Sequence, residues 1–154
     1  MLKWFCIFSA FTVFISSCVV RQPNANQVSF VSEENTGLIR VHVAGIGKNL
    51  LEIEQDAKTK VFESILFVGL PSSSTEAYRL PMVENKAEMQ NHPALKIFFN
   101  NKEYNQFITR VDRLEYLKQR VTGGGRVLNF NITVNHTALR RYMEQNQVIR
   151  KFGY

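Results

Sequence analysis

The N-terminal segment constrains this chain more than any other feature of its sequence. From Trp4 to Ser17 no residue carries a charge, while Lys3 precedes this apolar run and Arg21 follows it. The run is shorter than the stretch of about 20 apolar residues that a helix needs to cross a bilayer. A positive charge followed by a short apolar segment is typical of a signal peptide. We therefore expect residues 1–17 to be a targeting segment that is removed and takes no part in the folded domain.

The end of this segment resembles the lipobox of bacterial lipoproteins. Ile15 is apolar, Ser16 and Ser17 are small, and Cys18 stands where that motif has its cysteine. The resemblance implies that the thiol of Cys18 accepts a diacylglyceryl group and that Cys18 becomes the first residue of the mature protein. Acyl chains would then hold the protein at a membrane, at about 0.8 kcal/mol per buried methylene. A plain secretory leader or an uncleaved anchor is the alternative.

Length and cysteine content then predict a single domain without disulfides. The chain has 154 residues and two cysteines, of which Cys6 lies in the leader, so the mature protein keeps Cys18 alone. Residues 18–27 are polar and contain Pro23, which is typical of a tether between an anchor and a domain. We expect the single folded domain to cover residues 28–154.

The charge of the chain is mildly basic and widely scattered. The net charge is +6, and removal of the leader with Lys3 lowers it to +5. No dense basic run occurs, which argues against a nucleic-acid-binding protein. The C-terminal segment is the most basic part, and a cation also follows the glycines near residue 46. The candidate anion-binding residues are therefore Lys48, Arg140, Arg141, Arg150 and Lys151.

The pattern of apolar residues predicts an α+β fold, in which two or three helices cover a small antiparallel sheet. Alternation over residues 27–43 around a turn at 34–37 predicts a hairpin, and a three-to-four-residue period predicts a helix from about Leu50 to Gly69. Residues 70–84 read as a long loop and residues 91–108 as one or two short helices. From Thr109 two strands flank the glycines at 123–125. Asn135 or Thr137 can cap a last helix.

Beyond the leader, several segments resemble a group of small Bacteroidota lipoproteins. They are residues 43–47, 64–71, Phe98-Phe99, Tyr104 and the tail from Leu139 to Gly153. The resemblance implies a location in the bacterial cell envelope. Since no acidic cluster of the kind that directs surface export follows Cys18, it implies an outer-membrane protein that faces the periplasm. It implies no chemistry.

No motif in the chain predicts a catalytic, metal or cofactor site. Gly45-Ile46-Gly47 lacks the further glycine and the Ser or Thr of phosphate loops, so we interpret it as a strand-to-helix turn. The three histidines, His42, His92 and His136, match no metal-ligand spacing, and Ser72–Ser74 lack a nucleophile motif. The aromatic residues near Phe98 could line a ligand groove, but their spacing favours a helix packed on a sheet.

We therefore expect a protein that is not an enzyme. The first hypothesis is an accessory or scaffold subunit of a periplasm-facing assembly. Its partners would be an envelope protein and the membrane, to which the covalent lipid anchors it. The second hypothesis is a binding module for an anionic envelope glycan or lipid headgroup.

Overall fold

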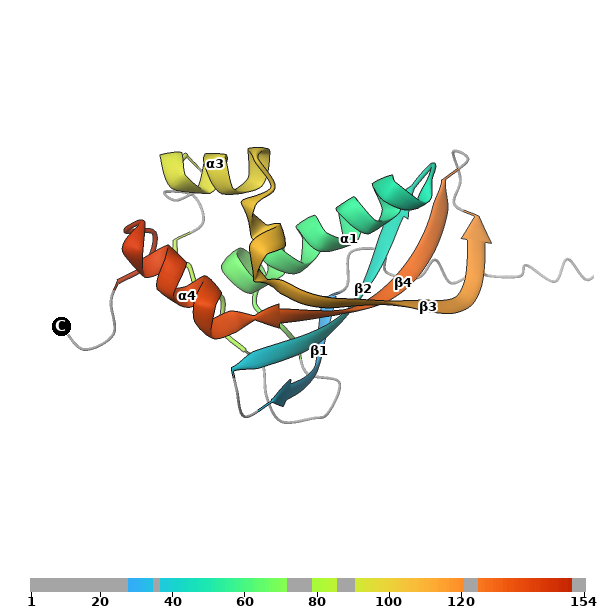
Figure 1. Ribbon diagram of the computed structural model, residues 1–154, viewed down its shortest axis with the longest axis horizontal. Helices are drawn as coiled ribbons and strands as arrows, with labels where there is room; N and C mark the ends of the chain where they lie inside the picture. The colour runs from blue at the N-terminus through green and yellow to red at the C-terminus, as the bar shows by residue number, and fades with distance from the viewer. Residues whose placement is uncertain (1–27, 35–36, 72–78, 86–90, 121–124, 151–154) are drawn as a thin grey trace, which may run out of the picture.

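A four-stranded antiparallel sheet with helices on one face forms the domain (Figure 1). The computed structural model describes residues 28–34, 37–71, 79–85, 91–120 and 125–150, with the side chains of 115–120 excepted. The strand order is β1-β2-β4-β3, and the described helices lie on the same side of the sheet. The predicted α+β class and the antiparallel sheet under helices are therefore confirmed.

The first hairpin follows from the alternation of apolar and polar residues in two strands and from one glycine in the turn between them. β1 (Val28–Glu34) pairs with β2 (Leu38–Gly47), in a register that places Val28 opposite Val43 and Glu34 opposite Leu38. Gly37 has φ 76°, a value that glycine adopts without steric cost, and its N–H donates to the carbonyl of Glu34. The predicted hairpin is confirmed, with turn residues 35–36 outside the described part of the chain.

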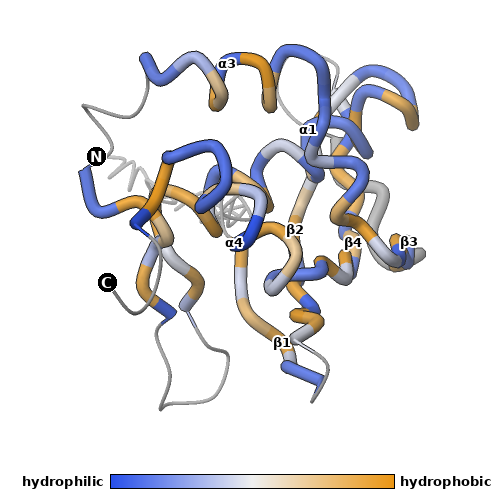
Figure 2. The backbone as a smooth tube through the Cα atoms, turned by 60° about the vertical axis from the view of Figure 1, so that its left-hand side comes forward, coloured by the Kyte–Doolittle hydropathy of each residue, from blue (hydrophilic) through white to orange (hydrophobic). Residues whose placement is uncertain are grey.

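In β2 every second side chain is buried, and this alternation shows which face of the sheet lies against the core. Ile39, Val41 and Val43 are fully buried, whereas Arg40 and His42 between them face the opposite side and are partly exposed. This alternation is what a strand with one covered face requires. In Figure 2 the hydrophobic colour marks stretches of the strands and part of α3.

The first helix returns directly over β2. α1 (Leu50–Glu63) begins at Asn49, whose side chain accepts from the N–H of Glu52, and it buries four residues on the sheet: Ile53, Ala57, Val61 and Phe62. A Cβ on Gly45 would lie 2.1 Å from the carbonyl oxygen of Ile53, and one on Gly47 would lie 2.7 Å from the Cβ of Glu52. Both glycines therefore belong to the C-terminal end of β2, where the strand lies against α1. The turn between strand and helix is Lys48-Asn49, so the prediction of a turn at Gly45-Ile46-Gly47 is corrected by two residues.

Side chains of α1 also complete the hydrogen bonding of β2 beyond its last described pair with β1. The N–H of Ile46 donates to Asp56 at 2.8 Å, and the ammonium of Lys60 donates to the carbonyl of Ala44 at 3.3 Å. Asp56 and Lys60 are themselves an ion pair at 2.6 Å. These contacts fix the helix along the strand, because buried or half-buried backbone groups need partners.

The C-terminal end of α1 widens into a π-helical turn, η1 (Ser64–Val68), that ends at Gly69 with φ 88°. The carbonyls of Ile65 and Leu66 accept from the N–H groups of Met82 and Val83, at 3.1 and 2.9 Å. The predicted helix end near Gly69 is thus confirmed. Of the predicted loop 70–84, the described residues include an antiparallel bridge between Leu70 and Arg79.

Aromatic side chains close the other end of the core. They come from α3 (Pro93–Asn100), the 3-10 helix η2 (Glu103–Phe107) and α1. Phe98 contacts the rings of Phe62, Tyr104 and Phe107 with centroids 5.8 to 6.1 Å apart. Phe98, Tyr104 and Phe107 are buried and Phe99 is half-buried, so the prediction that these aromatics belong to the core is confirmed.

The C-terminal half completes the sheet. β3 (Ile108–Arg120) pairs with β4 (Arg126–Asn135), which lies between β3 and β2. Asn135 then caps α4 (His136–Gln145) by accepting from the N–H of Ala138 at 2.9 Å, as one of the two predicted caps. Leu139 and Met143 of α4 are fully buried. Gly123 and Gly124 of the predicted turn lie outside the described residues.

Gly45 offers a test of the close contact between β2 and α1. We expect Gly45→Ala to lower the free energy of unfolding by about 1–3 kcal/mol, because the new methyl group collides with backbone rather than with a movable side chain. Urea denaturation followed by circular dichroism measures the change. Gly125→Ala is the matched control, since its Cβ would meet its nearest atom at 3.6 Å. Equal stability of the Gly45→Ala variant and the wild type would contradict this packing.

Candidate functional site

The face of the sheet opposite the helices carries a band of polar side chains. Strand register places Arg40, Thr133 and Arg110 side by side, and His42, Asn131 and Asp112 in the next row. β2, β4 and β3 each contribute to both rows. We call this set of six residues the polar face.

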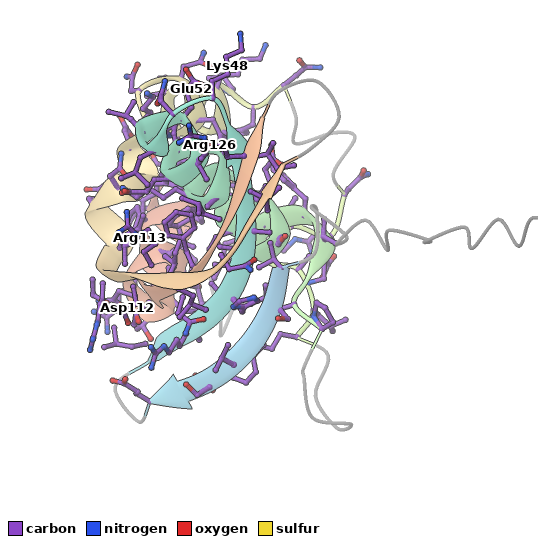
Figure 3. All side chains as sticks on the ribbon, turned by 90° about the vertical axis from the view of Figure 1, so that its right-hand side faces the viewer. Lys48, Glu52, Asp112, Arg113 and Arg126 are labelled. Carbon is purple, nitrogen blue, oxygen red and sulfur yellow. The ribbon has the colours of Figure 1, made fainter. Side chains whose placement is uncertain are left out.

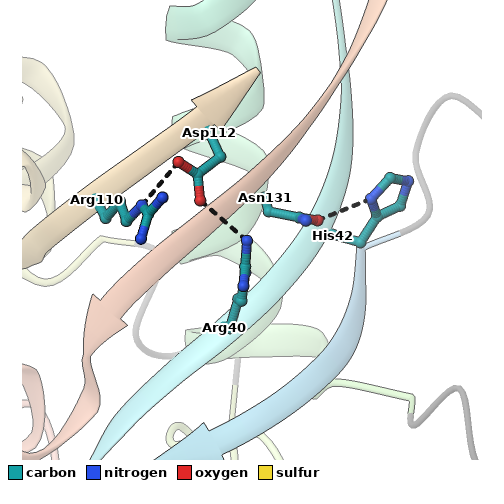
Figure 4. Close-up of polar contacts among 5 residues, drawn as sticks. All are labelled: Arg40, His42, Arg110, Asp112 and Asn131. Carbon is teal, nitrogen blue, oxygen red and sulfur yellow. Dashed lines mark hydrogen bonds and ion pairs between the residues drawn. The ribbon is translucent and has the colours of Figure 1, made fainter. Parts of the chain in front are cut away.

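Asp112 joins the two rows of the polar face (Figure 4). One carboxylate oxygen accepts from the guanidinium of Arg40 at 3.0 Å, and the other accepts from Nε of Arg110 at 2.7 Å. Beside this pair, Nδ1 of His42 lies 3.1 Å from the side-chain oxygen of Asn131. These contacts hold flexible side chains in one arrangement across three strands.

The polar face keeps hydrogen-bonding capacity that the described residues do not use. The Nε atom of Arg40 is buried and has no hydrogen-bond partner among them. Arg110 is 68% exposed in its side chain, and two guanidinium groups share the single carboxylate of Asp112. An arginine can donate five hydrogen bonds, so this surface can bind carboxylate, phosphate or amide oxygens.

Lys48 lies just before the N-terminus of α1. The position there that an anion could take is occupied by the carboxylate of Glu52. Glu52 accepts from the N–H of Lys48 at 2.8 Å and from the side chain of Asn49 at 2.6 Å. This reciprocal arrangement is a capping box. An anion bound at this position would have to displace Glu52, and Figure 3 shows Lys48 and Glu52 together at this end of the helix.

The structure separates the C-terminal cations that the sequence grouped. Arg140 donates to Glu144 at 3.0 Å on α4, whereas Arg141 and Arg150 are exposed. Cys18 and Lys151 lie outside the described residues. Lys48 is at the opposite end of the molecule from α4, so the candidate anion-binding residues do not form one cluster.

The start of α4 contains a half-buried histidine beside several charges. Burial lowers the pKa of His136 below its usual value of 6.5. The guanidinium groups of Arg79 and Arg140 lower the pKa further, and the carboxylate of Glu33 opposes them. Arg79 and Glu33 also form an ion pair with each other. Folding therefore favours the neutral form of His136.

A contact between a tyrosine and a carboxylate also involves α4. The hydroxyl of Tyr142 donates to Glu103 at 2.6 Å and links α4 to η2. Burial and this hydrogen bond raise the pKa of Tyr142 to about 12. The phenol thus stays protonated at neutral pH and serves as a donor.

An open groove lies on the helical side of the sheet, between the N-terminal half of α1 and β3. Its volume is about 900 Å³, and its walls are α1 residues, the start of β3, Lys102 and Asn105. Leu51 is 76% exposed at its rim. The groove exists because α1 lies over β2 and β4 and does not reach β3.

No group of three or more metal-ligating side chains occurs within the part of the chain that the structure describes. His42, His92 and His136 lie on β2, before α3 and on α4, so the structure does not bring them together. No helix among the described residues is long and apolar enough to span a membrane. Ser72–Ser74 lie outside the described residues.

The residues of the polar face were not singled out from the sequence, with the exception of His42. Their signal was present in part: Arg40 and His42 alternate with buried apolar residues in β2, as do Asn131 and Thr133 in β4. The pairing of β3 with β4 could not be read from this alternation. Without that register, Asp112 had no recognisable relation to Arg40.

Comparison with known proteins returned nothing in any of three searches. No protein-family model matches the chain, and no curated protein and no solved structure is significantly similar to it. The sequence and the geometry above therefore carry the functional argument.

His136 predicts an acid sensitivity of folding. Because its pKa is lower in the folded than in the unfolded state, the unfolded chain binds more protons as the pH falls through 6.5. The contribution of His136 to stability is present above pH 6.5 and is lost below it. We expect His136→Gln to flatten the dependence of the free energy of unfolding on pH between about 7 and 5. Urea titrations at several pH values measure it, and an unchanged slope would contradict the prediction.

Proposed function

We propose that this protein is a lipid-anchored lipoprotein of a bacterial cell envelope, and that its domain is a non-enzymatic accessory or scaffold subunit. In this proposal Cys18 carries the lipid and residues 18–27 act as a tether. The domain faces the periplasm from the outer membrane and binds an envelope protein.

Two features of the sequence support the anchor. The uncharged run from Trp4 to Ser17 has the length of a signal peptide, and Ile15-Ser16-Ser17-Cys18 resembles a lipobox. Several segments of the domain also resemble small Bacteroidota lipoproteins. A domain held at a membrane by acyl chains can act on partners that share that membrane.

The polar face is the observation that supports a binding role. The described helices lie on one side of the sheet, and the other side presents Arg40, Arg110, Asp112 and Asn131 on rigid strands. The hydrogen-bond donors and acceptors on this face are preorganised for a partner, because the contacts among these side chains already fix their positions. Strands hold such groups more accurately than loops do.

An anionic ligand is the second candidate. On the polar face two arginines share one carboxylate, which leaves an excess of positive charge. A carboxylated or phosphorylated glycan or a lipid headgroup would fit that charge. Such binding would weaken with added salt, because the arginine heads are in part exposed to solvent.

The intact mass of the protein extracted from membranes tests the anchor. We expect a product that begins at Cys18 and carries acyl chains, and we expect it to lack tryptophan fluorescence because Trp4 is the only tryptophan. Cys18→Ser should abolish the lipid and release the protein from the membrane fraction. An unacylated native chain that still begins at Met1 would contradict the proposal.

Recovery of partners from detergent-solubilised membranes tests the binding role. We expect Arg110→Glu to reduce recovery of the partner by about tenfold or more, because it reverses an exposed charge on the polar face. Arg141→Glu makes the same charge change on α4 and should leave recovery unchanged. Equal loss in both variants, or no partner at all, would count against this face. Salt-sensitive binding to anionic vesicles without a protein partner would favour the second candidate.

A further inference from the structure

The edge of β3 differs from the other edge of the sheet. β3 is the last strand in the order β1-β2-β4-β3, and among the described residues its main chain bonds only to β4. At the opposite edge the N–H of Phe30 in β1 donates to the carbonyl of Pro71 at 2.9 Å. The edge of β3 therefore offers donors and acceptors to another extended segment.

The groove described above runs beside this free edge. Its floor includes Ile108 and Val111 of β3, and Leu50 and Leu51 of α1 stand on its other side. These leucines are 45% and 76% exposed, which is unusual for large apolar residues at the first turn of a helix that caps a core. A strand added to β3 would point every second side chain into this groove.

Positive charges flank the groove: Lys102 is part of its lining, and Arg113 follows Val111, the last β3 residue of that lining. Lys102 lines it next to η2 and forms no ion pair with the described residues. Arg113 lies in register with buried Phe130, so its side chain is on the helical side of β3, and Figure 3 shows it across the strand from Asp112. Within the groove, Lys58 is paired with Glu54 at 2.6 Å. The unpaired charge that flanks the groove is therefore positive.

The length of this edge determines how many residues of an added strand can pair with it. From Ile108 to Arg113 a strand rises about 3.3 Å per residue, so about five residues of a partner would span it. The first, third and fifth of them would face the groove. The charges and the leucines then favour an acidic residue at each end and an apolar residue in the middle.

We propose that β3 accepts an extended segment of a partner protein as a fifth strand, in which an apolar side chain enters the groove between two acidic ones. Backbone bonds to β3 supply affinity, and Leu51, Lys102 and Arg113 select the sequence. The partner itself rests on the proposed accessory function, whereas the edge and the groove are properties of this chain alone.

Charges along β3 also oppose unspecific pairing at its edge. Arg110 and Asp112 lie on the polar face and Arg113 lies on the helical side, and charged side chains on an edge strand are a device by which proteins prevent unspecific strand pairing. A basic segment would be repelled by Arg113, which forms no ion pair with the described residues. An acidic segment would compensate this charge, so protection of the edge and selection of a ligand have the same origin.

The test uses the full chain purified in detergent and a fluorescent peptide. The peptide alternates Glu, Val and Glu with Thr, so that these three side chains share one face. Two control peptides keep all side chains but carry N-methyl groups on alternate residues, one on each edge of the strand. We expect the peptide to bind and one control to lose affinity about tenfold or more, since it cannot donate to β3, while the other binds normally.

Variants locate the site. Leu51→Glu and Arg113→Glu should each weaken binding about tenfold, because the first repels the acidic peptide at the rim and the second reverses its end charge. Leu80→Glu is the matched control, since Leu80 is 80% exposed and outside the groove. Circular dichroism shows that each variant is folded.

Three results would overturn the proposal. They are absence of peptide binding up to roughly 1 mM, equal affinity for both N-methylated peptides, and sedimentation that shows the edge occupied by a second copy of the chain. None of these results bears on acylation of Cys18 or on recovery of a partner from membranes by the wild-type chain, whereas Arg110 lines the groove as well as the polar face and so does not separate the two. Failure of strand addition and failure of the proposed function are therefore separate outcomes.

Discussion

The close approach of α1 to β2 determines how the rest of the domain is arranged. Gly45 and Gly47 have no side chains to hold the helix away, and Asp56 and Lys60 bond to the strand's own backbone. Together these contacts place the helix over β2 and β4. Because one helix covers about two strands, β3 stays outside the helical layer, and both the groove and the free edge follow from that placement.

The same placement divides the two faces of the sheet by chemistry. Apolar residues of β2 and β4 face α1 and are buried, and Arg40, His42 and Asn131 between them face the other side. Arg40 is hydrogen-bonded to Asp112, and His42 lies within hydrogen-bond distance of Asn131. The polar face can then stay open to water at little cost, since the half-exposed ion pairs need no apolar cover. A surface of this kind suits a domain that works by contact with a larger partner.

Local sequence patterns were sufficient to predict most helices and strands, but they did not predict which strands pair with each other. The hairpin of β1 and β2, the helix that ends at Gly69 and the Asn135 cap follow from alternation, from a three-to-four-residue period and from capping chemistry. The order β1-β2-β4-β3 depends on contacts between residues 72 and 89 positions apart, such as Arg40 with Asp112 and His42 with Asn131. Grouping Arg140 with Lys48 as anion ligands relied on charge alone, and the structure shows how their neighbours, Glu144 and Glu52, change that reading. Sequence could suggest the lipid anchor because that signal is local.

The short overhang of β2 beyond Val43 has a consequence for how such a domain can assemble. Its backbone groups at Ala44 and Ile46 are satisfied internally by Lys60 and Asp56, and Pro71 bonds to β1 on the same side of the sheet. Phe30, Ala44 and Ile46 on this side are thus partnered within the chain, whereas the main chain of β3 bonds only to β4 among the described residues. A partner strand added at β3 would pair with one strand of one subunit, and this gives a complex of fixed one-to-one stoichiometry.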